Sequence, residues 1–99
     1  MYGTIARLKL LPGKEAEMMA ETQGYERLGI DGFVATAVYR ADSGDDEYWL
    51  AVIFESKEKY RANADSPEQD ARFQKLAALM AAEPEWHDGE VIARQVAGG

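Results

Sequence analysis

The most informative absence in this sequence is cysteine, which occurs at none of the 99 positions. Disulfide bonds, thiolate nucleophiles and cysteine-ligated metals are therefore excluded, and a cysteine-free chain suits a cytoplasmic location. Histidine is nearly as scarce, because His87 is the single copy. A metal site built from several histidines of one chain is excluded as well, so we expect no metal.

Long apolar runs and an excess of positive charge are also missing. No stretch approaches the roughly 20 apolar residues of a membrane-spanning helix. No charged segment precedes an apolar one near the N-terminus, so we expect no signal peptide. The 11 basic residues are scattered among 18 acidic ones, which gives a net charge of −7. Partnership with nucleic acid or with an anionic membrane is therefore not expected.

Strand-like composition recurs along the chain. The sequence predicts four strands, over residues 2–10, 32–40, 48–55 and 89–96. Alternation in the first strand places Leu8 and Leu10 toward the core and Arg7 and Lys9 on the opposite face. The third strand, YWLAVIFE, is apolar on both faces, which indicates that both of its sides are covered.

Helical signals fill the gaps between these strands. Residues 14–28 predict a first helix with Ala16, Met19 and Ala20 as its buried stripe, and Gly29 suits its C-terminal stop. Ser56 can cap a short second helix over residues 57–65.

The strongest start signal belongs to the last helix. Ser66 is its expected cap, Pro67 suits the first helical position, and Gln69 can close a capping box. The apolar residues that follow have the i, i+3, i+4, i+7 spacing of a buried helix face; they are Phe73, Leu76, Ala77 and Met80. Pro84 ends this helix.

The resulting order of elements, β-α-β-β-α-β, predicts one α+β domain over residues 1–99 with a ferredoxin-like fold. Right-handed crossovers place both helices on one face of a four-stranded antiparallel sheet. The other face would then expose a large apolar surface. The simplest cover for that face is a second copy of the chain, packed sheet to sheet.

Three segments carry a resemblance to a known family. LKLLPGKEAEM leads into the first helix, GIDGFVATAVYR forms the second strand, and YWLAVIFESKEKYRANADSP joins a strand to a helix. With these patterns, residues 2–96 resemble the antibiotic biosynthesis monooxygenase family of dimeric α/β-barrel proteins.

The resemblance implies a homodimer whose two sheets form a barrel, with a pocket between sheet and helices in each subunit. It implies oxidation of a small aromatic or quinone-type molecule by O2 without any cofactor. Such a pocket stabilises the substrate anion, and the electron-rich carbon then reacts with O2. Two alternatives stay open: a dimeric ligand-binding or stress-related protein without turnover, and a structural dimer with a solidly packed barrel.

The haem-degrading branch of these relatives provides a contrast. That branch has an asparagine in the first strand, a tryptophan in the helix after the third strand, and a histidine ligand shortly afterwards. The matching places here hold Arg7, Asn63 and Arg72. Without the histidine ligand, haem has no anchor of that type, so titration with haemin should give no sharp Soret shift.

The segment Trp86-His87-Asp88 offers two interpretations. An aspartate beside a histidine resembles an acid–base pair, and histidine is the residue type that most readily exchanges a proton near neutral pH. However, neighbours in an extended segment point to opposite sides. We therefore expect mainly a corner, in which Trp86 packs over the barrel edge and Asp88-Gly89 turns into the last strand, and keep His87 as a secondary catalytic candidate.

The remaining candidates combine positive charge, amides and aromatic rings. Arg7, facing the barrel, could hold a phenolate or carboxylate, or could pair with a carboxylate across the dimer. Asn63 and Arg72 fall where relatives keep active-site groups. The alternative is that Asn63 caps a helix end and that Arg72 is a charge facing solvent. The aromatic candidates for stacking on a ligand are Tyr39, Trp49, Tyr60 and Trp86, although aromatic residues on strands also serve as plain core.

Overall fold

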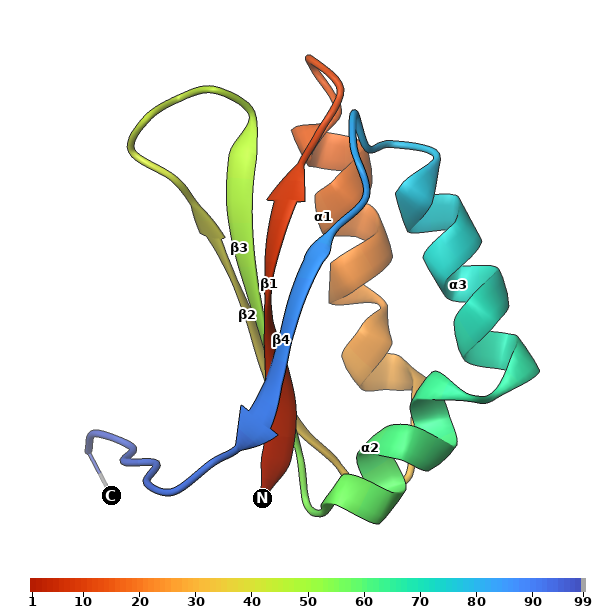
Figure 1. The fold of residues 1–99 in the computed structure, drawn as a ribbon, viewed down its shortest axis with the longest axis vertical. Coiled ribbons are helices and arrows are strands. Elements are labelled where there is room, and N and C mark those ends of the chain that lie inside the picture. The colour runs from red at the N-terminus through yellow and green to blue at the C-terminus, as the bar shows by residue number, and fades with distance from the viewer. Residues whose placement is uncertain (99) are drawn as a thin grey trace.

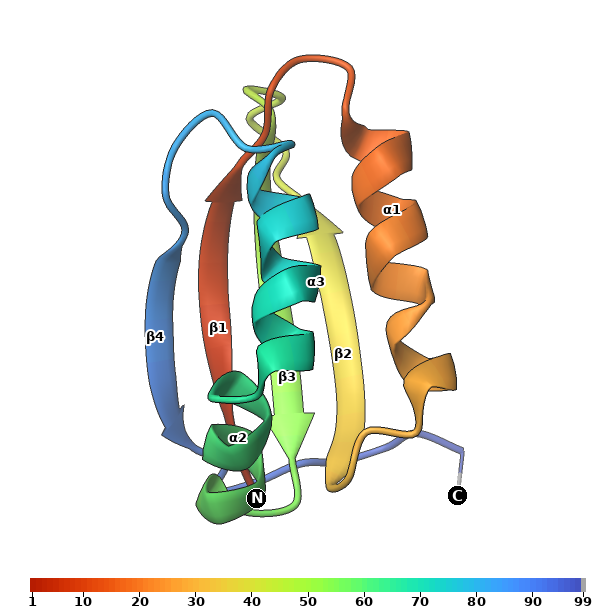
Figure 2. The same ribbon diagram turned by 90° about the vertical axis from the view of Figure 1, so that its right-hand side faces the viewer.

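The computed structural model describes residues 1–98 and has the expected ferredoxin-like architecture. The elements are β1 (Tyr2–Lys9), α1 (Glu15–Gln23), the short 3₁₀ helix η1 (Tyr25–Leu28), β2 (Phe33–Arg40), β3 (Glu47–Phe54), α2 (Lys57–Ala64), α3 (Pro67–Ala77) and β4 (Glu85–Glu90). The strands form one antiparallel sheet in the order β2-β3-β1-β4. All three α-helices cover the same face of this sheet, as Figures 1 and 2 show.

The core lies between that face and the helices, and its position follows from the alternation in β1. Thr4, Ala6 and Leu8 are buried, whereas Ile5 and Arg7 are exposed on the opposite face. The predicted orientation of the first strand is therefore confirmed. The buried cluster consists of Ala6, Leu8, Leu10, Met18, Tyr48 and Leu50.

The first helix differs from its prediction. Helix α1 ends at Gln23, and a separate 3₁₀ turn carries the chain to Gly29, whose φ of 64° is left-handed. Met18 is the buried residue of α1, whereas Ala16 and Ala20 are exposed, so the expected stripe was wrong at both alanines. The face toward the sheet runs instead through positions 15, 18, 19 and 22. The first and last of these positions hold the polar residues Glu15 and Thr22, so the sequence does not show the helical spacing of this face.

Both predicted serine caps are confirmed. The Ser56 hydroxyl accepts a hydrogen bond from the Lys59 backbone N–H, and Ser66 accepts one from the backbone N–H of Gln69. The capping box is not closed, because the Ser66 backbone N–H donates to the Asn63 carbonyl. The Gln69 side chain is consequently available for other contacts.

The prediction for the last strand was wrong. Strand β4 is Glu85–Glu90, so Trp86, His87 and Asp88 belong to the strand and do not form a corner before it. The position of this strand is determined by where a partner strand is available. Strand β4 pairs antiparallel with β1, and its Glu90 already lies opposite Tyr2, at the start of β1. Within the described residues, the segment 92–98 has passed the end of β1, so it has no neighbouring strand, whatever its strand propensity.

The open face of the sheet carries apolar side chains. Ile5 and Tyr39 are 54% and 62% exposed, and Trp49 lies beside Tyr39 on the paired strands β2 and β3. Beyond β4, Ile92 in the C-terminal segment is 95% exposed. This arrangement agrees with the inference that the face opposite the helices needs a cover.

Candidate functional site

A cavity of about 710 Å³ lies between the helix-covered face of the sheet and helices α2 and α3. Its apolar walls come from strands β3 and β4 and helix α3 and include Leu50, Val52, Phe73, Leu76 and Trp86. The rings of Phe73 and Trp86 pack against each other with centroids 6.0 Å apart. A volume of this size suits a small multi-ring molecule.

One end of the cavity holds a closed polar network of four side chains, Tyr25, Asn63, Gln69 and Arg72. The Asn63 amide nitrogen donates to the Tyr25 hydroxyl at 2.9 Å, and this hydroxyl donates to Gln69 Oε1 at 3.0 Å. Arg72 donates to Gln69 Oε1 at 3.1 Å and to Asn63 Oδ1 at 3.3 Å. Each acceptor oxygen is thus satisfied, and all four groups are held in fixed orientations.

The end of the cavity that holds this network presents hydrogen-bond donors and a positive charge. Burial raises the pKa of Tyr25 above its usual value, while the Asn63 hydrogen bond and the Arg72 charge act in the opposite direction. The Arg72 guanidinium also lies 5.6 Å from the centre of the Tyr25 ring. Among the described residues, two N–H groups of Arg72 and one amide hydrogen of Asn63 are committed, which leaves further donors on both side chains. This end can therefore stabilise an oxygen anion.

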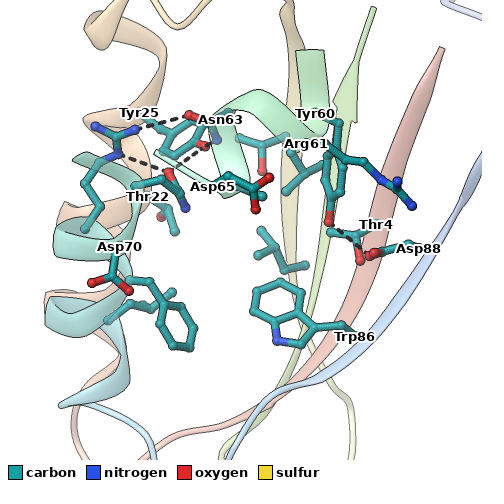
Figure 3. A pocket seen from close by; sticks show the side chains of 18 of the residues that line it. Thr4, Thr22, Tyr25, Tyr60, Arg61, Asn63, Asp65, Asp70, Trp86 and Asp88 are labelled. Atoms are coloured by element: carbon teal, nitrogen blue, oxygen red, sulfur yellow. Dashed lines mark hydrogen bonds between the residues drawn. The ribbon is translucent and has the colours of Figure 1, made fainter. Parts of the chain in front are cut away.

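A second polar group lies on the other side of the cavity, where Figure 3 shows Thr4, Tyr60 and Asp88 together. The Tyr60 hydroxyl donates to Asp88 Oδ1 at 3.0 Å. Burial first, and next the hydrogen bond to Asp88, raise the pKa of Tyr60 to about 12. Tyr60 therefore keeps its proton at neutral pH and cannot serve as a phenolate base.

The structure brings half of the predicted site residues together. Asn63, Arg72, Tyr60 and Trp86 all line the cavity. The other four, Arg7, Tyr39, Trp49 and His87, lie on the open face of the sheet, where Arg7 pairs in register with Trp49 and Trp49 with Tyr39. The eight candidates therefore lie on two separate surfaces: alternation along the strands places Trp86 on the cavity face and the other four on the open face, while Tyr60, Asn63 and Arg72 come from helices α2 and α3.

The charged candidates on the open face already have partners. Arg7 Nε lies 2.6 Å from Glu47 Oε1, and its Nη1 lies 3.9 Å from Glu85 Oε2. The hydrogen bond to Glu47 is the main reason that the pKa of Arg7 is raised. His87 Nε2 lies 2.8 Å from Glu85 Oε1 and does not contact Asp88, because the two neighbours point to opposite faces.

Sequence reasoning missed Tyr25, Gln69, Thr4 and the cavity-facing role of Asp88. Gln69 was interpreted as a capping residue only. Asp88 was placed in a turn, although alternation starting at Glu85 would have placed it on the same face as Trp86. Tyr25 follows Gly24, within the stretch that was expected to be continuous helix.

Two absences concern the part of the chain that the structure describes. No helix within residues 1–98 is long and apolar enough to cross a membrane. Over the same residues, no three histidine, aspartate or glutamate side chains are grouped so that they could hold a metal ion.

Taken together, the fold and the cavity define a ferredoxin-like α+β protein with an aromatic-walled cavity beneath its helices. The chain belongs to the antibiotic biosynthesis monooxygenase family, whose sequence model matches residues 1–75. No match was found among curated proteins.

Solved structures with the same fold span nearly the whole chain. One is SnoaB from Streptomyces nogalater, described as a cofactor-independent oxygenase, with 18% identity, coverage of 99% of this chain and 97% of that one, and a TM-score of 0.77. Another, from Chloroflexus aurantiacus J-10-fl, is provisionally named an antibiotic biosynthesis monooxygenase; it has 21% identity, 98% coverage of both chains and a TM-score of 0.78. At these identities the likeness establishes the fold.

Proposed function

We propose that this protein is a small monooxygenase that oxidises a neutral aromatic or quinone-type molecule with O2 and without a cofactor. The observation that carries the proposal is the cavity, whose apolar and aromatic walls end at the fixed Asn63–Arg72 donors. Membership of the antibiotic biosynthesis monooxygenase family and the fold shared with a cofactor-independent oxygenase support it.

The proposed chemistry depends on stabilising an anion. An anthrone-type substrate loses a proton from its ring methylene, and the charge moves to the carbonyl oxygen. Arg72 and Asn63 hydrogen-bond that oxygen, which increases the fraction of anion at neutral pH. The carbanion adds O2 and takes up one proton to give a hydroperoxide, and loss of water from it leaves a new carbonyl group. One O2 is consumed, with one of its oxygen atoms retained in the product and the other released as water.

The charges around the cavity favour a ligand that enters neutral. Four carboxylates line the cavity, from Glu21, Asp65, Asp70 and Asp88, against the two guanidinium groups of Arg61 and Arg72. A permanently anionic ligand would meet net repulsion at this surface. A neutral phenol or ketone can enter and acquire its charge only beside Arg72.

The homodimer is part of the same proposal. A second copy packed on the open face would cover Ile5, Tyr39 and Trp49, and would place Arg7 and His87 inside a barrel. Catalytic roles for Arg7 and His87, and ligand contacts for Tyr39 and Trp49, remain predictions that require this second surface. We also propose a cytoplasmic location, consistent with the cysteine-free sequence and testable by cell fractionation.

The dimer should be visible directly in solution. Light scattering at micromolar concentration is expected to give about twice the 11.0 kDa mass of the chain. Ile5→Lys, which places a charge on the open face, should shift the protein toward monomer. The matched control is Leu28→Lys, at a residue that is 51% exposed on η1, away from the sheet. A well-folded parent monomer would refute the proposed barrel.

A second candidate function is ligand binding without turnover. One observation favours it: the sequence has a single histidine, and its ring lies on the sheet face opposite the cavity. The cavity therefore has no group of ordinary near-neutral pKa to remove the substrate proton. Under the leading proposal, anion stabilisation by Arg72 makes water or buffer a sufficient base.

Oxygen uptake with anthrone distinguishes the two functions. We expect the protein to consume O2 and anthrone in equal amounts and to form anthraquinone, at a rate proportional to protein concentration and abolished by heat denaturation. If anthrone binds but O2 is consumed no faster than in buffer, the monooxygenase function is contradicted and the ligand-binding function is supported. An oxygen electrode with product quantification by chromatography provides both quantities.

A further inference from the structure

The Thr4 side chain is an unusual feature of the cavity wall. Thr4 is only 6% exposed, and its hydroxyl makes no hydrogen bond of good geometry to a described residue, although it lies near enough to the Tyr60 hydroxyl to act on the pKa of Tyr60 in the lowering direction. It lies on the face of β1 that lines the cavity. Buried hydroxyl groups almost always have a partner, because leaving one unsatisfied costs stability. A polar group of a bound ligand can supply that partner here.

Asp88 faces the same point from the neighbouring strand. In the β1–β4 register, Thr4 lies opposite Asp88, so both side chains project from the same face of the sheet. Asp88 Oδ1 accepts the hydrogen bond from Tyr60, and its second carboxylate oxygen is bonded to none of the described side chains. Figure 3 shows Thr4, Tyr60 and Asp88 gathered on one side of the cavity, with Tyr25 and Asn63 on the other.

The two polar sides have opposite hydrogen-bonding character. The Asn63–Arg72 side has free N–H donors. The side formed by Thr4, Tyr60 and Asp88 is rich in acceptors, because the Tyr60 proton is already donated to Asp88 and a carboxylate only accepts. Acceptors of this kind are complementary to an O–H group.

We propose that Thr4, Tyr60 and Asp88 form a second subsite, which selects ligands with a hydroxyl group on the ring edge remote from the carbonyl or enolate oxygen. The ligand class is therefore a flat hydroxylated aryl ketone whose carbonyl lies at Arg72 and whose hydroxyl donates to Asp88. This inference rests on the proposed function, since both place an aromatic ligand in the same cavity. It adds Asp88 and Thr4 as residues that determine specificity.

The test uses two probes that do not react with O2, namely 9-fluorenone and 2-hydroxy-9-fluorenone. Calorimetry at pH 6 keeps the hydroxyl group of the second probe protonated. The parent protein is expected to bind the hydroxylated probe about tenfold or more tightly, as a hydrogen bond to a carboxylate allows. Asp88→Asn should reduce this preference to about threefold or less while affinity for 9-fluorenone is retained.

Two further variants make the test specific. Thr4→Val has the same shape without the hydroxyl and should lower the preference in part. Asp70→Asn removes the same charge from another position of the cavity lining and should leave the preference unchanged. Thermal melts confirm that each variant is folded.

Three outcomes would overturn the subsite: equal affinity of the parent for both probes, a preference that survives Asp88→Asn, or an equal loss in Asp70→Asn. If Thr4→Val alone has no effect, the role of Thr4 is refuted. These failures leave the proposed oxygenase intact, because they concern only the hydroxyl group. If neither probe binds, the aromatic ligand itself is contradicted, and the proposed function is contradicted with it.

Discussion

Replacing Arg72 with methionine is expected to reduce the rate of oxygen uptake with anthrone by about 100-fold, which corresponds to ~2.7 kcal/mol of transition-state stabilisation. The reason is the position of the guanidinium beside Asn63 and Gln69, where it is the only cation of the polar network. Removing it deprives the developing anion of both charge and hydrogen bonds in a half-buried site. Part of the lost rate of oxygen uptake should return at high pH, where anthrone ionises without assistance.

The matched control for Arg72 lies on the same helix. Lys75→Met removes a positive charge from an exposed position of α3 that does not line the cavity, and should leave the rate unchanged. Arg72→Lys should recover only part of the lost rate, because an ammonium group lacks the planar fork that bridges Gln69 and Asn63. Parent-like activity of a folded Arg72→Met variant would show that the network is structural.

The second large effect concerns stability. Gly3→Ala is expected to lower the free energy of unfolding by about 3 kcal/mol, because overpacking of this kind forces backbone to move. A Cβ atom at Gly3 would lie 1.8 Å from the carbonyl oxygen of Val52 and 3.1 Å from Cα of Ile53. Both contacts are with the backbone of β3, so no side chain can rotate away. The melting temperature should fall by roughly 12 °C or more.

The neighbouring strand provides the control for Gly3. Gly89 pairs directly with Gly3 in the β1–β4 register, and a Cβ atom there would meet nothing within 4 Å. Gly89→Ala should therefore change the melting temperature by no more than a few degrees. Equal melting temperatures for the two variants would mean that β1 and β3 approach less closely than described.

The fold was predictable because its signals are local. The alternation in β1, the serine caps of α2 and α3, and the apolar third strand each specify an element from a few adjacent residues. The last strand was misplaced because pairing is a long-range property. The segment that follows β4 has a composition more typical of strands than Glu85–Glu90 has, but only Glu85–Glu90 lies beside β1.

The candidate site was predictable only in part, for a related reason. Asn63 and Arg72 were chosen by resemblance, and the structure places them in one hydrogen-bonded network. Gln69 and Tyr25 complete that network from a cap position and a 3₁₀ turn, and no spacing in the sequence relates them. Arg7 was expected to face away from Leu8, which is confirmed, but that face is the one without the cavity.

Whether the cavity stabilises the anion of its ligand can be measured by an anaerobic titration of bound anthrone. The neutral ketone can only accept hydrogen bonds, so its oxygen should lie at Asn63 and Arg72. The visible absorbance of the anthrone anion then reports its pKa in the complex. We expect the parent to lower this pKa by at least about one unit, ~1.4 kcal/mol, and Arg72→Met to abolish the shift. An unchanged or raised pKa in the parent would contradict anion stabilisation by Arg72 and Asn63, because an apolar cavity lined by carboxylates gives that result when it has no effective donors.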